Sequence, residues 1–179
     1  MLKLLNTLVF LLLLSGVAQA QDGFEKVACG SDIPAALIGK QMSNEPLVAT
    51  EGRHKALALK ELGADEISDR LTTISWLICG SEYMVLVDSH SKVRDVLAIP
   101  PHSKSAPEFS GSCRIDGKEQ PGIVVAILDG KTGASTDAEA LLAAQAAWKV
   151  DEQHSKFVKL ATEGLRCPRS GIITADIRD

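Results

Sequence analysis

The segment TTISWLICGSEYMVLVD, residues 72–88, decides the fold of this chain. Residues 72–79 and 82–88 are rich in β-branched and aromatic side chains and show the alternation of strands. Gly80 and Ser81, which lie between them, are typical turn residues. The segment therefore predicts an antiparallel β-hairpin with its turn at Gly80-Ser81.

A helix is the alternative for the first half of this segment. Over residues 65–79, a helical period would place Ile67, Leu71, Ile74 and Ile78 on one face. The second half is too short and too β-branched to be helical. We therefore expect the hairpin, with a helix over 65–79 as the competing interpretation.

Two further strands extend the pattern. Residues 93–99 predict a third strand, which ends at Pro100 and Pro101 because proline cannot supply the N–H groups of a ladder. The three strands would form a meander. Residues 122–128 are a nearly continuous apolar run, which predicts a strand in the middle of the sheet, buried on both faces.

The region after this strand predicts a loop at 129–133, a helix and a final hairpin. Thr136 and Glu139 have the spacing of a capping box, and residues 138–147 are rich in alanine, so we expect a helix there. Residues 148–151 and 156–159 predict the hairpin. The expected fold class is α+β: mainly antiparallel β-sheet, built of a meander and hairpins, with one or two short helices and stabilised by disulfides.

Residues 1–20, MLKLLNTLVFLLLLSGVAQA, have the pattern of a secretory signal peptide. Lys3 precedes an apolar run that is too short to span a bilayer stably, and the run ends in a small-x-small tripeptide. Gln21 follows, where a lipoprotein would have cysteine. We expect cleavage after Ala20 and a single secreted or periplasmic domain over 21–179, without a stable membrane anchor.

The composition argues against two classes of partner. The chain has 19 Lys plus Arg and 23 Asp plus Glu, and removal of Lys3 with the leader changes the formal net charge from −4 to −5. Affinity for nucleic acid or anionic lipid comes mainly from clustered basic residues, and the sequence has no such run. We therefore expect neither as a partner.

Four cysteines, Cys29, Cys79, Cys113 and Cys167, follow the leader. An even number in an oxidising compartment predicts two disulfides, and no C-x-x-C motif indicates redox or zinc chemistry. Three pairings are possible. We favour Cys29 with Cys79 and Cys113 with Cys167, because the first two lie in the similar settings VACGSD and LICGSE.

Common catalytic motifs such as G-x-S-x-G and H-E-x-x-H are absent from the sequence. On residue type alone, His102 or His90 would be the base of a catalytic site, with Asp95 or Glu108 as the acid. His90 lies within the polar segment 89–92, and Asp88 immediately precedes it. We interpret this segment as a solvated turn. The sequence gives no reason to expect a cofactor or a metal ion.

Residues 100–112, PPHSKSAPEFSGS, predict an extended loop held between a strand and Cys113. Long irregular loops often carry function, and proline lowers the entropy lost on binding. We expect Pro101, His102, Lys104 and Phe109 to contact a partner. The sequence thus favours a binding or inhibitory module whose partner is another extracytoplasmic protein. The alternative is a small extracytoplasmic hydrolase with a histidine and an acid in its site.

Overall fold

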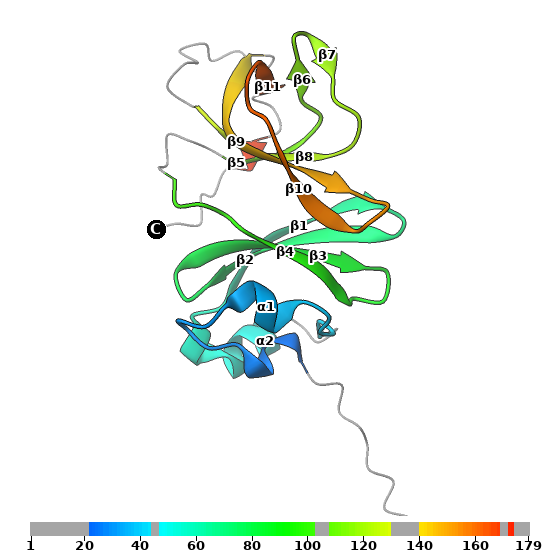
Figure 1. Ribbon diagram of the computed structural model, residues 1–179. Helices are drawn as coiled ribbons and strands as arrows, with labels where there is room; N and C mark the ends of the chain where they lie inside the picture. Colours follow the sequence, from blue (N-terminus) through cyan, green and yellow to red (C-terminus); the bar gives the residue numbers. More distant parts are fainter. Residues whose placement is uncertain (1–21, 44–46, 103–107, 130–139, 169–171, 174–179) are drawn as a thin grey trace, which may run out of the picture.

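The structure is a computed structural model that describes residues 22–43, 47–102, 108–129, 140–168 and 172–173. The expected leader therefore lies outside the described residues. Figure 1 shows three layers: short helices, a first β-sheet above them, and a second, curled sheet above the first. The expectation of mainly antiparallel sheet with few, short helices is confirmed.

The first sheet is an antiparallel meander of four strands in sequence order. They are β1 (Lys60–Ser68), β2 (Leu71–Ile78), β3 (Ser81–Asp88) and β4 (Val93–Ala98). The predicted hairpin and third strand are confirmed, while the alternative helix over 65–79 is wrong because that segment contributes to β1 and β2. Strand β1 was not predicted, since its middle residues 63–66 are exposed and lack an apolar alternation.

The hairpin turn lies one residue earlier than predicted. Ile78 pairs with Ser81, so the two-residue loop is Cys79-Gly80 rather than Gly80-Ser81. Both loop residues have positive φ, 54° for Cys79 and 79° for Gly80. Positive φ at both positions matches the twist of the flanking strands, which favours this kind of tight turn. The sequence did not indicate a turn at this place, because its first residue is cysteine, which is not a usual turn residue.

In the part of the chain that the structure describes, the second sheet has eight strands, and the long strand β9 lies in its middle. Its order is β12 (Ile172–Ile173), β5 (Glu108–Gly111), β8 (Val124–Leu128), β9 (Leu141–Asp151), β11 (Leu165–Pro168), β6 (Arg114–Ile115) and β7 (Lys118–Glu119), and β10 (Lys156–Leu160) also pairs with β9. The predicted buried strand is confirmed as β8, and every one of its residues is buried. The predicted final hairpin is confirmed as β9–β10.

The alanine-rich helix is wrong, because Leu141–Asp151 forms β9. The proposed cap at Thr136 and Glu139 lies outside the described residues. A register shift in the pairing with β8 places Leu142, Ala144 and Ala147 in one core although their spacing is uneven. Such a bulge removes the period of two from the sequence, so helix propensity was the remaining local signal.

Four short helical segments among the described residues form the first layer. They are η1 (Gly23–Lys26), α1 (Ile33–Leu37), α2 (Leu47–Arg53) and η2 (Lys55–Leu57). They cover one face of the first sheet and form with it the helix-side core: Phe24, Val27, Ile33, Leu37, Met42, Leu57, Leu59, Trp76, Ile78, Val85, Val87, Val93 and Val96. None of the described helices is long and apolar enough to cross a membrane.

The other face of the first sheet packs on the second sheet. The residues between the two sheets form what we call the inter-sheet core. The first sheet and the residue that follows it contribute Leu71, Met84, Leu86, Leu97 and Ile99, and the second sheet contributes Val125, Ile127 and Val150. The second sheet curls around a further core on its far side, which contains Val124, Ala126, Leu128 and Leu165. Residues 84–87 of β3 and all of β8 are therefore covered on both faces, which is why these stretches are unbroken apolar runs.

Both favoured disulfide pairings are confirmed. The Cys29–Cys79 bridge ties the first layer to the hairpin turn of the first sheet, and Cys113–Cys167 joins the residue before β6 to β11. Two disulfides are typical of an oxidising compartment.

Candidate functional site

The candidate site is a groove at one end of the interface between the two sheets. Alternation along the strands places Leu77, Glu82 and Ile99 on the face of the first sheet that packs on the second. Leu77 pairs with Glu82, and the Ile99 amide donates to the Glu82 carbonyl over 2.9 Å. Farther along the same face, Met84 and Leu97 are covered by the second sheet.

The chain leaves β4 beside this groove and crosses toward the second sheet. The groove has a volume of about 510 Å³. Its lining is Leu77, Gly80, Ser81, Glu82, Tyr83, Ala98, Ile99, Pro100, Pro101 and His102. Pro100 and Pro101 are exposed at its rim. The start of the predicted 100–112 loop therefore forms one wall, and the end of the β2–β3 hairpin forms the other.

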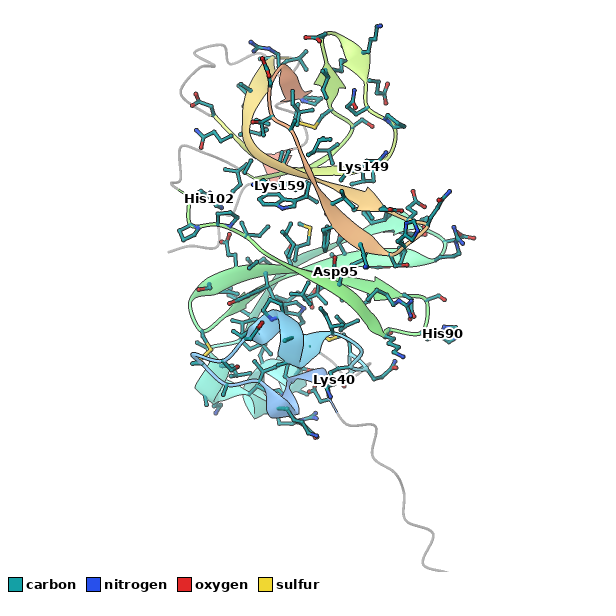
Figure 2. The ribbon with its side chains drawn as sticks, viewed as in Figure 1. Lys40, His90, Asp95, His102, Lys149 and Lys159 are labelled. Carbon is teal, nitrogen blue, oxygen red and sulfur yellow. A yellow bond between two sulfur atoms is a disulfide. The ribbon has the colours of Figure 1, made fainter. Side chains whose placement is uncertain are left out.

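His102 and Glu82 meet in the groove. The Nε2 atom of His102 lies 3.4 Å from Glu82 Oε2, and the two side chains are only 7% and 14% exposed. Figure 2 shows His102 at the edge of the molecule, level with the gap between the sheets. A carboxylate beside a histidine holds the imidazole ring in one orientation. The pair could therefore hold a polar ligand or, with a suitable substrate, move a proton.

Glu82 is a site residue that the sequence reasoning missed. Its position follows from the strand register. Glu82 lies close to the hairpin turn and opposite Ile99, and Ile99 precedes His102 by three residues. A correct register for β3 and β4 could have found the pair. Neither acid that we proposed for His102 is shown beside it: Asp95 makes other contacts, and the Glu108 side chain lies outside the described residues.

Asp95 joins the two sheets. Its Oδ2 accepts a hydrogen bond of 2.8 Å from the Phe157 amide on β10, and its Oδ1 accepts one of 2.9 Å from the Val96 amide. Figure 2 shows Asp95 in the middle of the molecule, well away from His102. The contacts of Asp95 in the structure are thus those of a residue that links β4 to the outer edge of β10.

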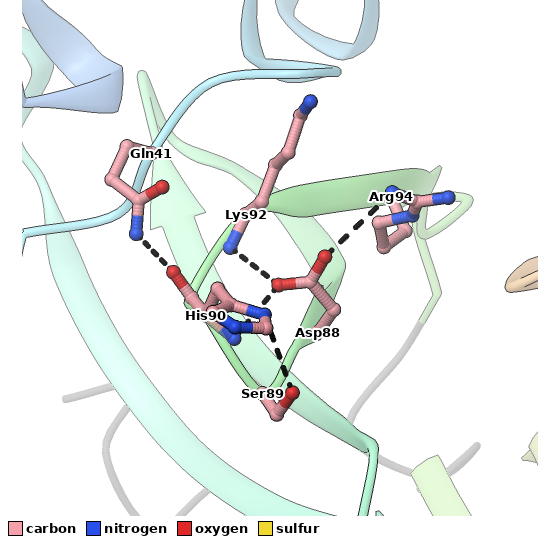
Figure 3. A network of polar contacts seen from close by, with 6 residues as sticks. All are labelled: Gln41, Asp88, Ser89, His90, Lys92 and Arg94. Atoms are coloured by element: carbon pink, nitrogen blue, oxygen red, sulfur yellow. Dashed lines mark hydrogen bonds and ion pairs between the residues drawn. The ribbon is translucent and has the colours of Figure 1, made fainter.

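His90 lies in an exposed turn on another side of the molecule from His102 (Figure 2). Figure 3 shows how Asp88 organises this turn: its Oδ1 accepts from the amides of His90 and Lys92, at 2.9 and 3.0 Å. Arg94 lies 3.6 Å from the second oxygen of Asp88. The Asp88 carboxylate is thus engaged by backbone amides and an arginine, as in a turn.

The predicted binding-loop residues are only partly described. Pro101 and His102 line the groove. Lys104 lies outside the described residues, and Phe109 is described only through its backbone in β5, where it pairs with Ala126. Among the described residues, no group of three or more His, Cys, Asp or Glu is placed to hold a metal ion.

The fold and the groove define a disulfide-stabilised protein of two packed antiparallel sheets, with a groove that is lined by apolar residues and the Glu82–His102 pair. Comparison with protein-family models, with curated proteins and with solved structures gives no match to this chain. The function is therefore argued from the site alone.

Proposed function

We propose that the protein is exported, loses residues 1–20, and acts as a binding module that holds another extracytoplasmic protein in the groove beside Pro100, Pro101 and His102. The observation that carries this proposal is the groove itself, which combines apolar walls with the Glu82–His102 pair. Binding sites in proteins commonly have this composition: mostly apolar lining with a few polar groups that orient the ligand.

The two prolines favour a binding role for this wall. A proline has a fixed φ angle, so the Pro100-Pro101 segment loses little conformational entropy when a partner docks against it. The opposite wall is also rigid, because the Cys79-Gly80 turn, which is followed by Ser81, is tied to the first layer by the Cys29–Cys79 disulfide. A preformed groove of this kind binds an extended segment at low entropic cost.

A small hydrolase remains the second candidate, and one observation favours it. Ser81, Glu82 and His102 line the same groove, and they are the residue types of a nucleophile, an orienting acid and a base. His102 would take the proton of the attacking group and Glu82 would hold the ring. The acid in this version is Glu82 rather than the Asp95 or Glu108 of the sequence-based hypothesis.

A photo-crosslinking experiment tests the binding function. The photoreactive amino acid benzoylphenylalanine is placed at Pro101 or, as a control, at the exposed Lys118 of β7, and the exported protein is irradiated in its native host. We expect one specific adduct from position 101 and none from 118. Ser81→Trp, which fills the groove, should abolish the adduct, while Ser89→Trp in the exposed turn at the other end of β3 should not.

Equal adducts from both positions, or none from position 101, would contradict the binding function. The hydrolase version is tested with p-nitrophenyl esters and fluorescent casein as substrates. Turnover that is lost in His102→Gln but kept in His90→Gln would replace the binding function by the catalytic one.

A further inference from the structure

A second groove, which we call the β9–β10 groove, lies beside the loop that joins β9 to β10. Its volume of about 480 Å³ is within the usual range of ligand sites, about 300–1,000 Å³. Its lining is Pro121, Gly122, Lys149, Val150, Asp151, Glu152, Gln153 and Val158. Figure 2 shows Lys149 in the second sheet, well away from His102. The two grooves are therefore separate, and the β9–β10 groove can bind a ligand whether or not the first one does.

Strand register places a lysine in this groove. Lys149 on β9 pairs with Val124 on β8 and with Val158 on β10, so the three side chains lie in one row across the second sheet. Trp148 and Val150, on either side of Lys149, face the inter-sheet core. Because successive side chains of a strand point to opposite faces, Lys149 lies on the face that is turned away from the first sheet.

Gly122 leaves room for the stem of Lys149. A Cβ atom built on this glycine would lie only 3.3 Å from Lys149 Cε, so the lysine chain crosses directly over it. The φ angle of Gly122 is 83°, which also favours glycine at this position. The Lys149 residue is half-buried as a result. The lysine therefore packs along the groove instead of extending into water.

Two opposite charges line the β9–β10 groove without pairing. Within the part of the chain that the structure describes, neither the Lys149 ammonium nor the Glu152 carboxylate makes a hydrogen bond or an ion pair. Glu152 is half-buried, like Lys149. Water screens charges in such positions less than it screens charges on an open surface, so both can interact strongly with a ligand.

The third charge of the groove, Asp151, is already engaged. Its Oδ2 lies 2.8 Å from His154 Nδ1, and its Oδ1 accepts hydrogen bonds of 3.0 and 3.2 Å from the amides of Gln153 and His154. The hydrogen bonds from His154 and from these amides lower the pKa of the Asp151 carboxyl. Asp151 thus organises the loop, which leaves Lys149 and Glu152 as the charges that a ligand can meet.

We infer that the β9–β10 groove binds a small zwitterion with an apolar part: a free amino acid, or a short peptide whose two termini are free. The ligand carboxylate would contact the Lys149 ammonium, and the ligand ammonium would contact the Glu152 carboxylate. A ligand with a single charge would leave one of the two without a partner. Pro121 is exposed beside them and Val158 is 48% exposed, so an apolar side chain of the ligand would cover both.

NMR titrations of the exported, ¹⁵N-labelled protein test the inference. The probes are leucine, Leu-Leu and Leu-Leu-Leu, each with free termini, with the amine acetylated, or with the carboxylate amidated. We expect at least one free compound to shift the amide signals of Gly122 and Val158, but not those of Ser81 and Ala98 at the first groove. Either blocked form should have a Kd about 10- to 100-fold higher, the usual effect of one lost charge-assisted hydrogen bond. The compound that binds most tightly distinguishes an amino acid from a peptide ligand.

Variants that remove one charge assign each contact. Lys149→Met keeps an unbranched apolar stem and should raise the Kd of the free compound, while that of the amidated form stays the same because this form has no carboxylate. Glu152→Gln should likewise weaken the free compound and leave the acetylated form unchanged. Lys118→Met and Glu119→Gln, at exposed positions on β7, are the matched controls and should change neither Kd. The comparison of free and blocked compounds in the unmodified protein does not depend on how any variant folds.

Three results would overturn the inference. If a blocked form binds as tightly as its free compound, the groove does not recognise that charge and its ligand is not a zwitterion. If no compound shifts the Gly122 and Val158 signals at about 10 mM, the groove does not bind this class of ligand. If the control variants weaken binding as much as Lys149→Met and Glu152→Gln do, these two residues do not contact the ligand. None of these results changes the crosslinking result at position 101, which tests the first groove alone.

Discussion

Asp22 is the residue that anchors the beginning of the described chain. Its side chain is 1% exposed, and its Oδ1 accepts a hydrogen bond from the Phe24 amide, which caps η1. Its Oδ2 lies 2.9 Å from His54 Nε2 and 3.6 Å from Arg53. Because Phe24 also packs edge-on against Trp76, this one carboxylate connects the start of the chain to the helix-side core.

Asp22→Ala should therefore destabilise the protein by about 2–4 kcal/mol, since it removes a cap and leaves the polar groups of His54 without their buried partner. Urea unfolding at neutral pH measures the change. Asp69→Ala, at an exposed position between β1 and β2, is the control and should change the free energy of unfolding by less than about 0.5 kcal/mol. Similar effects of the two variants would contradict the anchoring role.

Glu61 gives a prediction about pH. Burial raises the pKa of the Glu61 carboxyl, and the nearby Glu51 carboxylate raises it further. The folded protein thus binds this proton more tightly than the unfolded chain does, so the contribution of Glu61 to stability falls as pH rises from the unfolded to the folded pKa. Glu61→Gln should raise the free energy of unfolding at pH 7 by less than about 1 kcal/mol, because solvent screens a half-exposed charge.

The gain should disappear at a pH where the Glu61 carboxyl is protonated in both the folded and the unfolded chain, below the ordinary glutamate pKa of about 4.3. Urea titrations of the wild type and Glu61→Gln at several pH values would show it. A gain that is independent of pH would mean that the substitution acts through packing instead.

At the scale of elements, the two disulfides differ in access. Cys29 is exposed and Cys79 is half-buried, whereas Cys113 and Cys167 are fully buried at 0% exposure. The accessible bridge holds the Cys79-Gly80 turn, and Gly80 and the following Ser81 line the groove. Reduction of this bridge would therefore release the turn that forms one wall of the candidate site.

A dithiol reductant under native conditions should reduce Cys29–Cys79 first, because thiol–disulfide exchange requires the attacking thiolate to reach a sulfur atom. Peptide mass spectrometry after alkylation measures the order. Cys113–Cys167 should become reactive only when urea unfolds the chain. If both bridges are reduced at one rate in the folded protein, the second bridge opens by local unfolding and burial does not protect it.

At the scale of the whole molecule, the first sheet is the middle layer and shares a core with each neighbour. Leu86 is fully buried in the inter-sheet core beside Val150 of β9, while Val85 and Val87, on either side of it, face the helix-side core. The Asp95–Phe157 hydrogen bond spans the same interface. Loss of one layer would therefore expose the core of the next, and we expect all three layers to unfold together.

Leu86→Ala should lower the free energy of unfolding by about 2–5 kcal/mol. The two tryptophans report on different layers, because Trp76 lies in the helix-side core and Trp148 packs against the inter-sheet core. In single-tryptophan variants with phenylalanine at the other position, the urea midpoints should coincide and should shift equally on Leu86→Ala. Separate midpoints would show that the sheets unfold as independent units.

Local sequence patterns determined several elements of this protein. The alternation of residues 72–79 and the apolar runs at 82–88 and 122–128 predicted β2, β3 and β8, because side-chain period and β-propensity act within a few residues. The paired settings of Cys29 and Cys79 led to the right disulfides. The first part of β9, residues 141–147, escaped prediction because its bulge breaks the period and its alanines favour a helix locally.

The candidate site was decided by the tertiary structure. Sequence reasoning selected Pro101 and His102 from a loop composition, and both line the groove, but the acid beside His102 is Glu82, which lies 20 residues earlier in the chain. Asp95, proposed as that acid, instead meets Phe157, 62 residues later. The sequence by itself determined where β2, β3, β4 and β8 form, since their local periodicity and β-propensity agree with the fold. Which side chains meet depends on strand register and on the stacking of the sheets, and these are set by long-range packing.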